Sequence, residues 1–304
     1  MSVCAIVVTH NRRALLVECL AALRAQERPV DAVLVVDNAS TDGTGELLRT
    51  EFAEAEVLSL PENLGSSGGF HAGLERALAG GHDWLWLMDD DTIPSPGALA
   101  ALLAVPERLA AAGLPPADLL ASRVVWRDGR LHPMNAPGAD RRDVAHMAAA
   151  AQLGLLPLRS TTFVSLLATS EAARTHGLPN PGFFIWSDDL DWTARILRRG
   201  HGYLVPESVA EHRTKEPHTS LTEAGPRFYY HLRNTLYMVR RGPWEAGERL
   251  ALAVLATTST LAYLRGARLG RAELATVGRA LRDGLLRPVP RLPAQTRSDA
   301  SASG

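Results

Sequence analysis

The sequence predicts an α/β protein in which a mainly parallel sheet is flanked by helices and followed by a C-terminal helical extension. Its first hundred residues alternate short, continuous apolar runs with segments whose apolar residues recur at helical spacing. Continuous apolar runs are typical of strands buried on both faces, and a strand–helix–strand order favours parallel pairing. Beyond Pro226 the pattern is helical throughout. We therefore expect a sheet domain over residues 1–225, a helical extension over 226–287 and a disordered tail over 288–304.

The first four strands and the helices between them follow one alternation. Each predicted strand is an apolar run, and the helix after the first strand carries Leu16, Leu20 and Leu23 on one stripe. A glycine-rich turn separates the third strand from its helix. The strands are expected at 3–8, 32–36, 57–60 and 84–88, and the helices at about 15–23, at about 43–54 and through Leu74 and Leu78.

The second half of the sheet domain carries weaker signals. The stretch from 135 to 158 is interpreted as a flexible or acceptor-facing loop, and a helix is expected to begin near Asp188. A hairpin turn is expected at Asp128-Gly129. The remaining strands are expected at 119–126, 162–168 and 203–205, with a turn at 206–208, and the helices of the extension at 228–240, 244–264 and 273–286.

Composition excludes several classes of protein. The chain is 46% apolar and 21% charged, which is typical of a soluble globular protein, and its net charge of −1 offers no broad footprint for nucleic acid. Cys4 and Cys19 fall on predicted buried positions, so they are expected to be core residues in a reducing compartment. Since no signal peptide or spanning run is visible, we expect a cytoplasmic protein. Residues 250–264 are expected to form a packed helix, with a membrane-surface helix as the alternative.

Polar groups follow each of the first four predicted strands. In parallel sheets, ligands bind beyond the carboxyl ends of the strands, where segments far apart in the sequence meet. This convergence is the main argument from the residues alone for a functional site. The four groups are Thr9 to Arg12, Asp37-Asn38, Asn63 to Gly65, and Asp89 to Asp91.

The three consecutive aspartates predict a metal site. Adjacent carboxylates at a strand end repel one another, so they need a cation or several donors nearby. Asp89 and Asp91 alternate along the chain and supply hard oxygen ligands for Mg²⁺ or Mn²⁺, and such a metal can bridge a diphosphate. The alternative is a solvated acidic turn.

For two further candidate segments, the residues alone leave both a functional and a structural interpretation open. The glycines of Asn63 to Gly69 let backbone amides approach a phosphate or sugar, although such a loop is often only a turn. Asp188 and Asp189 open a helix that Ser187 is expected to cap, and Asp189 is expected to be partly exposed and ionised at neutral pH. A carboxylate there is either a general base or an acidic residue that only stabilises the helix end. Asp191 is expected to pair with Arg195.

Taken together, the segments resemble the inverting family-2 glycosyltransferases with the GT-A fold, over about residues 2–240. The likeness is strongest to the galactofuranosyltransferase and rhamnosyltransferase branch. Each motif is modest, but their order and spacing are specific. The matching blocks are 7–12, 36–44, 63–65 with 68–69, 88–91, 183–191, 205–208 through His212, and 229–234.

This resemblance implies a role for each site residue. Asp189 would be the base that deprotonates the acceptor hydroxyl, and the sugar would be transferred from a nucleotide-diphosphate donor with inversion. A divalent metal, Mn²⁺ or Mg²⁺, would be held by Asp89, Asp91 and His212. Trp186 and Asp188 would shape the acceptor site. The donor would contact Thr9, Asn11, Arg12, Asp37, Asn63, Gly65 and Asp90.

The resemblance leaves the partners partly open. A glycan, a lipid-linked glycan or another hydroxyl compound fits as acceptor, while the inner face of a membrane and a second copy of the chain remain open as contacts. Ser66-Ser67 stand where many relatives carry Gly or Ala, and the strand at 162–168 lacks a glycine that many relatives have. A dehalogenase-type phosphatase is disfavoured because the acidic pair expected downstream of a lysine does not follow Lys215. A nicotinamide dehydrogenase is disfavoured because the first strand lacks the glycine fingerprint. A non-catalytic protein of the same fold is the remaining alternative.

Overall fold

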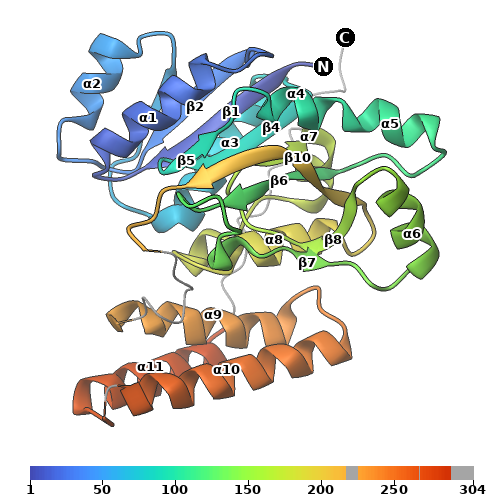
Figure 1. Ribbon diagram of the computed structural model, residues 1–304. Helices are drawn as coiled ribbons and strands as arrows, with labels where there is room; N and C mark the ends of the chain where they lie inside the picture. Colours follow the sequence, from blue (N-terminus) through green and yellow to red (C-terminus); the bar gives the residue numbers. More distant parts are fainter. Residues whose placement is uncertain (217–224, 267, 289–304) are drawn as a thin grey trace, which may run out of the picture.

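The computed structural model describes residues 1–216, 225–266 and 268–288. A twisted sheet forms the centre of the molecule, helices cover both of its faces, and three C-terminal helices form a separate layer beneath it (Figure 1). This arrangement confirms the predicted α/β class with a helical extension. The predicted disorder of 288–304 falls almost wholly outside the described residues.

The strands of the described residues form one mixed sheet in the order β3-β2-β1-β4-β9-β6-β10-β8-β7, with β5 paired to β10. The predicted parallel pairing holds for β1 to β4, whereas β9 runs antiparallel to both β4 and β6. The strand bounds are β1 Val3–Thr9, β2 Ala32–Asp37, β3 Glu56–Ser59, β4 Trp84–Asp89, β5 Thr92–Pro94, β6 Leu119–Val125, β7 Gly138–Ala139, β8 Leu156–Ser160, β9 Leu166–Thr169 and β10 Gly202–His212.

Alternation along β1 explains the two-sided core. Val3, Ala5 and Val7 belong to one apolar cluster, while Cys4 and Ile6 between them belong to the cluster on the other face. Both faces are therefore buried, as the continuous apolar run predicts. The two cysteines are buried and free, as expected. The helices that cover the two faces are α1 Arg13–Arg24, α2 Thr44–Glu51, α3 Gly65–Ala79, α4 Ala98–Leu103, α5 Val105–Ala111, α6 Val144–Gln152, α7 Ser170–His176 and α8 Asp188–Ile196.

The second half of the domain differs most from the sequence prediction. The stretch 135–158 is not a loop: it contains a 3₁₀ turn that ends at Asn135, strand β7, helix α6 and the start of β8. Helix α6 is rich in alanine and is half exposed, so it lacks the apolar stripe on which the prediction relied. The strand predicted at 162–168 begins later, at Leu166. The turn predicted at 206–208 is a register shift inside the single strand β10.

The helical extension packs against the sheet domain through α9. Its helices are α9 Phe228–Arg241, α10 Ala246–Gly266 and α11 Arg271–Leu286, close to their predicted ranges. Phe183 and Ala194 of the sheet domain pack with Tyr237 and Met238 of α9. Buried Arg159 binds Glu248 of α10 at 2.7 Å and also donates to the backbone carbonyl of Pro243. No helix of the described residues is long and apolar enough to span a bilayer.

Candidate active site

The carboxyl ends of β1, β2 and β4 meet at one edge of the sheet, as the strand order predicts. Thr9 at the end of β1 is in register with Asp37 of β2, and Val8 is in register with Asp89 of β4. Strand β5 then turns back and pairs with β10, placing Thr92 opposite His212. The sheet thus brings the first, second and fourth predicted groups to one edge, and it places the fourth beside a histidine more than a hundred residues away.

Asp90 is held by residues at the end of β1. The Thr9 hydroxyl donates to the buried Asp90 carboxylate at 2.8 Å, and the Arg12 guanidinium lies 3.4 Å from its other oxygen. Burial raises the pKa of Asp90 to about 7, although Arg12 and Thr9 both oppose that rise. Thr9 therefore supports an aspartate, in addition to any contact it makes with a donor.

Asp91 lies between the side chains of Arg12 and His212. It pairs with Arg12, and its Oδ1 lies 3.3 Å from His212 Nε2. Burial alone raises the pKa of Asp91, but His212 and Arg12 outweigh burial and bring it to about 2. His212 Nδ1 lies 2.8 Å from Asn135 Oδ1, an oxygen that only accepts, so Nδ1 donates to Asn135 and Nε2 is the ring nitrogen that faces Asp91.

The donor atoms beside Asp91 fit a divalent cation. Its Oδ1 is buried, makes no hydrogen bond among the described residues and faces His212 Nε2, and a carboxylate oxygen beside an imidazole nitrogen is a ligand pair that Mn²⁺ accepts. The predicted three-residue set is not already assembled, because the described residues contain no group of three or more acidic, histidine or cysteine side chains in metal-binding geometry. Asp91 and His212 are brought together, whereas Asp89 does not join them in such a group.

The carboxyl ends of β1, β2 and β4 are called the donor edge here, and Asp89 on this edge interacts electrostatically with the aspartates of helix α8. Burial raises its pKa well above the usual range, and the charges of Asp91, Asp90 and Asp189 raise it further. Asp89 also raises the pKa of Asp188. The carboxylates of both segments therefore repel one another in a single buried region, where a cation would relieve the repulsion.

The remaining donor-side residues form a network of turns. Asn11 adopts φ 53° and accepts from the Thr41 backbone N–H at 2.7 Å. Asp37 accepts from the Ser40 backbone N–H at 2.9 Å. Asn38 bonds both the carbonyl of Gly65 at 2.9 Å and the N–H of Leu64 at 2.8 Å. These turns fix the loops around the edge where a nucleoside is expected.

Gly65 is the contact between the donor edge and the loop before α8. Helix α3 begins at Gly65, so the predicted loop at 63–69 lies largely within the first helical turns, and Asn63 accepts from the Gly65 N–H at 2.8 Å. Gly65 has φ +72°, and a Cβ added there would lie 1.9 Å from the Phe184 carbonyl oxygen. Only glycine adopts this positive φ without strain and also leaves room for the Phe184 carbonyl oxygen.

The loop that precedes the predicted base is strained. Phe184, Trp186 and Ser187 all have positive φ values, between 64° and 67°. Such values are uncommon for residues with side chains and cost on the order of 1–3 kcal/mol each. Ser187 occupies the position before α8, but its hydroxyl does not cap the helix, which corrects the prediction.

Asn234 of α9 holds this strained loop. Its fully buried amide donates to the carbonyls of Phe183, Ile185 and Trp186 at 2.9–3.1 Å, and the neighbouring Arg233 donates to the carbonyls of Gly182 and Phe183 at 2.8–2.9 Å.. The extension therefore contributes directly to the candidate site, because α9 supplies the hydrogen bonds that keep the loop in place.

The loop presents two carboxylates with different surroundings. Asp188 is buried, and its Oδ2 has no hydrogen-bond partner among the described residues. Asp189 is half buried, and its Oδ1 accepts from the Leu190 N–H at 2.7 Å. Desolvation raises the pKa of Asp189 to about 6, so this half-buried carboxylate stays mostly ionised at neutral pH, as expected. Asp191 pairs with Arg195 at 3.4 Å, as expected.

Three asparagines in supporting roles escaped the sequence prediction. Asn38 and Asn234 lie inside the blocks that carried the resemblance, yet nothing in their residue type indicated which backbone groups they bind. Asn135 begins the stretch interpreted as a loop, so no signal marked it as the partner of His212.

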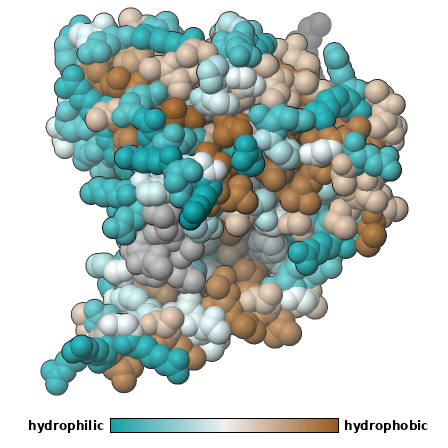
Figure 2. All heavy atoms as spheres, in the orientation of Figure 1, coloured by the Kyte–Doolittle hydropathy of each residue, from teal (hydrophilic) through white to brown (hydrophobic). Residues whose placement is uncertain are grey.

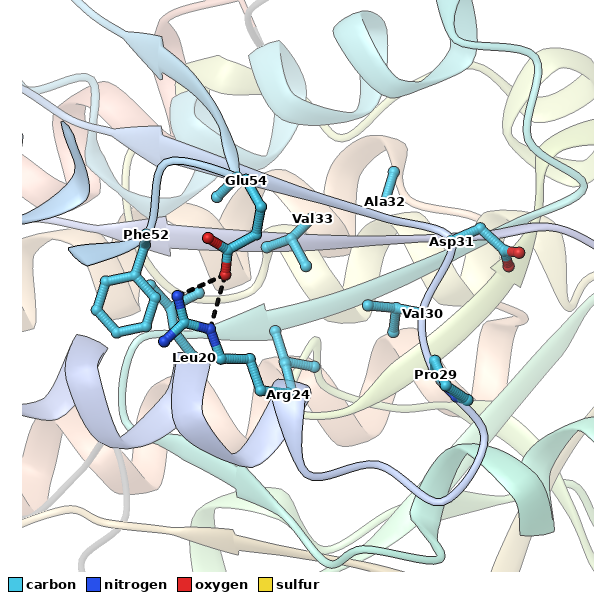
Figure 3. Close-up of a pocket in the computed structure, with 11 residues that line it drawn as sticks. Leu20, Arg24, Pro29, Val30, Asp31, Ala32, Val33, Phe52 and Glu54 are labelled. Carbon is cyan, nitrogen blue, oxygen red and sulfur yellow. Dashed lines mark hydrogen bonds and ion pairs between the residues drawn. The ribbon is translucent and has the colours of Figure 1, made fainter. Parts of the chain in front are cut away.

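A pocket of about 270 Å³ lies at the opposite edge of the sheet (Figure 3). It is lined by residues at the start of β2, including Ala32 and Val33, together with Phe52. Arg24 lies over the Phe52 ring and pairs with Glu54 at the rim. Since β2 runs from this pocket towards Asp37, the pocket is separate from the aspartates.

The sequence is similar to a known family and to curated relatives. Residues 4–127 match the family model described as Glycosyl transferase family 2. The chain is 31% identical over 210 residues to galactofuranosyltransferase GlfT1 of Mycolicibacterium smegmatis, and 33% identical over 205 residues to GlfT1 of Mycobacterium tuberculosis. The alignments cover 65% and 66% of this chain, and 66% of the length of each relative.

Comparisons of the structure support the fold. The chain is similar to residues 1–349 of S. aureus TarS crystallised with UDP-GlcNAc, with a TM-score of 0.63 and 17% identity over 93% of this chain and 80% of that one. It is also similar to GalNAc-T7 crystallised with UDP, GalNAc and Mn²⁺, with a TM-score of 0.55 and 12% identity over 78% of this chain and 48% of that one.

Proposed function

We propose a specific reaction for this chain, which belongs to glycosyl transferase family 2 and is therefore a glycosyltransferase. In this reaction a sugar, with galactofuranose or rhamnose favoured, passes from a nucleotide-diphosphate donor to an acceptor hydroxyl with inversion. The observation that carries the proposal is the meeting of two carboxylate groups: the Asp89–Asp91 turn and the Asp188-Asp189 pair affect each other's pKa values in one buried region.

The comparisons favour a uridine-diphosphate donor. The two GlfT1 relatives are galactofuranosyltransferases by name, and the TarS fragment was crystallised with UDP-GlcNAc. We place the nucleoside near Asn11 and Asp37, and the donor along Asn63, Gly65 and Arg12. The ordered turns that Asn11 and Asp37 form support this placement.

We assign the metal, Mn²⁺ or Mg²⁺, to Asp91 and His212, with Asp89 as the third ligand. The unpartnered Asp91 oxygen and the orientation of His212 by Asn135 support this assignment. When bound, the metal would neutralise negative charge on the departing diphosphate. Arg12 is a second positive charge at the same position, because it already pairs with Asp91 and Asp90.

Asp189 acts as the general base in this proposal. It takes the proton of the acceptor hydroxyl while the hydroxyl oxygen bonds to the anomeric carbon and the bond from that carbon to the diphosphate oxygen breaks. A pKa of about 6 leaves Asp189 mostly ionised at neutral pH and makes it a better base than an ordinary aspartate. Trp186 and Asp188 lie on the same loop and shape the acceptor site. A single displacement of this kind inverts the anomeric configuration.

The test is metal-dependent release of nucleoside diphosphate from UDP-galactofuranose, dTDP-rhamnose, UDP-glucose and UDP-N-acetylglucosamine, with glycan and lipid-linked glycan acceptors. We expect turnover of the first or second donor with Mn²⁺ or Mg²⁺, and its loss in Asp91→Ala. Turnover that persists in a chelator would contradict the metal assignment. Binding of UDP without turnover of any donor would instead favour a non-catalytic protein of the same fold.

A further inference from the structure

The outer helices of the extension expose an unusually apolar face. Helices α10 and α11 both contain residues that pack on α9, and α9 lies between them and the sheet domain (Figure 1). The exposed side of α10 carries Leu250, Val254 and Leu261, which are 66%, 53% and 49% exposed. Figure 2 shows apolar atoms gathered over the start of α10. Large exposed apolar faces of this kind mark contact surfaces.

This face carries no acidic residue along α10. Between Glu248 and the end of the helix, the only charged residues are Arg249 and Arg265. The intervening polar residues are threonines, one serine and Tyr263, whose hydroxyl donates to the Gly225 carbonyl at 3.0 Å. Thr257 and Thr258 return their hydroxyls to backbone carbonyls one turn earlier, at 2.9 Å each, so these side chains satisfy their polar groups within the helix. The face therefore offers no unmet polar group that would oppose removal from water.

Positive charge is concentrated at the turn that joins α10 to α11. Arg265, Arg268 and Arg271 are exposed there, and none forms an ion pair with the described residues. Leu269 lies among them at 62% exposure, and Leu274 follows one turn into α11. The turn thus presents apolar side chains surrounded by unpaired guanidinium groups.

The charge of the whole extension differs from that of the rest of the chain. Residues 226–287 contain eleven arginines and four acidic residues, although the complete chain has a net charge of −1. The sheet domain is therefore acidic and the extension is basic. An apolar face bordered by arginine complements an anionic lipid surface, in which acyl chains lie beneath negatively charged headgroups.

We propose that the outer face of α10 and the α10–α11 turn dock on an anionic phospholipid bilayer, with α10 lying on the surface. No described helix could span a bilayer, so the contact is peripheral. The proposal goes beyond the proposed reaction and is independent of the donor. It also gives lipid-linked acceptors a route to the site, because α9 of the same layer holds the loop that carries Asp189.

The test is sedimentation of the full chain with vesicles of phosphatidylglycerol and phosphatidylcholine, compared with vesicles of phosphatidylcholine alone. We expect binding to the anionic vesicles that weakens as salt is added. The apolar variant Leu250→Ser/Val254→Ser/Leu261→Ser should lose most binding. Its matched control is Leu131→Ser/Val144→Ser, which alters two residues of the sheet domain that are 63% and 68% exposed.

The charge variant Arg265→Gln/Arg268→Gln/Arg271→Gln should bind anionic vesicles on the order of 100-fold more weakly, since each arginine near such a surface contributes about five-fold. Arg127→Gln/Arg130→Gln/Arg141→Gln, on the sheet domain, is its control and should bind as the parent does. Circular dichroism checks the fold of each variant.

Three outcomes would overturn the proposal. The parent chain could fail to bind either kind of vesicle, or the control variants could lose binding as strongly as the test variants. In the third outcome, the parent chain is a dimer, and the apolar variant is monomeric but still binds vesicles. This result would show that the apolar face contacts a second copy of the chain. None of these measurements uses donor or acceptor, so failure here is distinct from failure of the proposed reaction.

Discussion

The donor edge and the loop before α8 contribute to one site by different physical means. At the donor edge, Thr9, Asp37 and Asp89 sit at the ends of regular strands, where the register of the sheet fixes their positions. The loop before α8 has no such register: its positive φ angles are held by side chains from α9. The proposed binding groups are therefore positioned by the core of the sheet, whereas the proposed base depends on hydrogen bonds from the extension.

Loss of the proposed base should have the largest selective effect. Asp189→Asn keeps the size of the side chain and removes its basicity, so turnover should fall by roughly 10³–10⁴-fold, in the upper part of the range usual for such catalysts. UDP binding, measured by calorimetry, should remain as in the parent, because the donor edge is unchanged. Equal turnover in both proteins would remove Asp189 from its proposed role.

Loss of a proposed metal ligand should lower both turnover and metal binding. Asp91→Ala removes the partner of His212 and Arg12, so turnover should fall about 10³-fold and Mn²⁺ affinity, followed by electron paramagnetic resonance, should fall with it. Asp191→Ala is the matched control, since Asp191 pairs only with Arg195 among the described residues. If manganese binding survives in Asp91→Ala, the ligand assignment is wrong.

The hydrogen bonds from the extension should matter for turnover more than for donor binding. Asn234→Ala removes three hydrogen bonds to the loop, so kcat should fall by about 10–100-fold through misplacement of Asp189. Hydrogen exchange of residues 183–187 should accelerate in this variant, while the dissociation constant of UDP should hardly change. A variant with slower exchange or parental kcat would show that the loop keeps its shape without α9.

The contact between the two regions should be sensitive to a single methyl group. Gly65→Ala adds a Cβ against the Phe184 carbonyl and an unfavourable φ, which together should lower stability by more than the ~1–2 kcal/mol of the φ term alone. Gly113→Ala is the control, because Gly113 has φ +67° but no atom within 4 Å of an added Cβ. Thermal unfolding of the two variants separates the effect of the Phe184 contact from that of backbone strain. Equal losses of stability in the two variants would show that the contact has no effect.

The smallest predicted effect concerns pH. Asp189 must be ionised to act as a base, so kcat/KM should be full above its pKa and should fall as the pH drops through about 6. An ordinary aspartate would place this loss near pH 4. An acidic limb near pH 4 in the pH–rate profile would contradict the desolvation of Asp189.

The sequence predicts the parts of the molecule that rest on repetitive patterns. Strands β1 to β4, their connecting helices and the meeting of Thr9, Asp37 and Asp89 follow from apolar runs and parallel topology. The three helices of the extension follow from helical spacing. These features are local or depend on simple rules of strand order, so residue types suffice to identify them.

Features that depend on tertiary contacts were not predictable in this way. The binding of His212 by Asn135 joins residues 77 positions apart, and helix α6 gave no periodic signal. The strain at Phe184 and Trp186 is invisible in their residue types, and the elevated pKa of Asp189 follows from burial that only the folded chain produces. The strain and the raised pKa both belong to the loop before α8 and the start of that helix, which lack regular strand register.

The anomeric configuration of the product tests the central claim most directly. If Asp189 deprotonates the acceptor for a single displacement, nuclear magnetic resonance of the purified product should show an anomeric configuration opposite to that of the donor sugar. A product with retained configuration would require two displacements or a different attacking group, and would contradict the assignment of Asp189 as the general base.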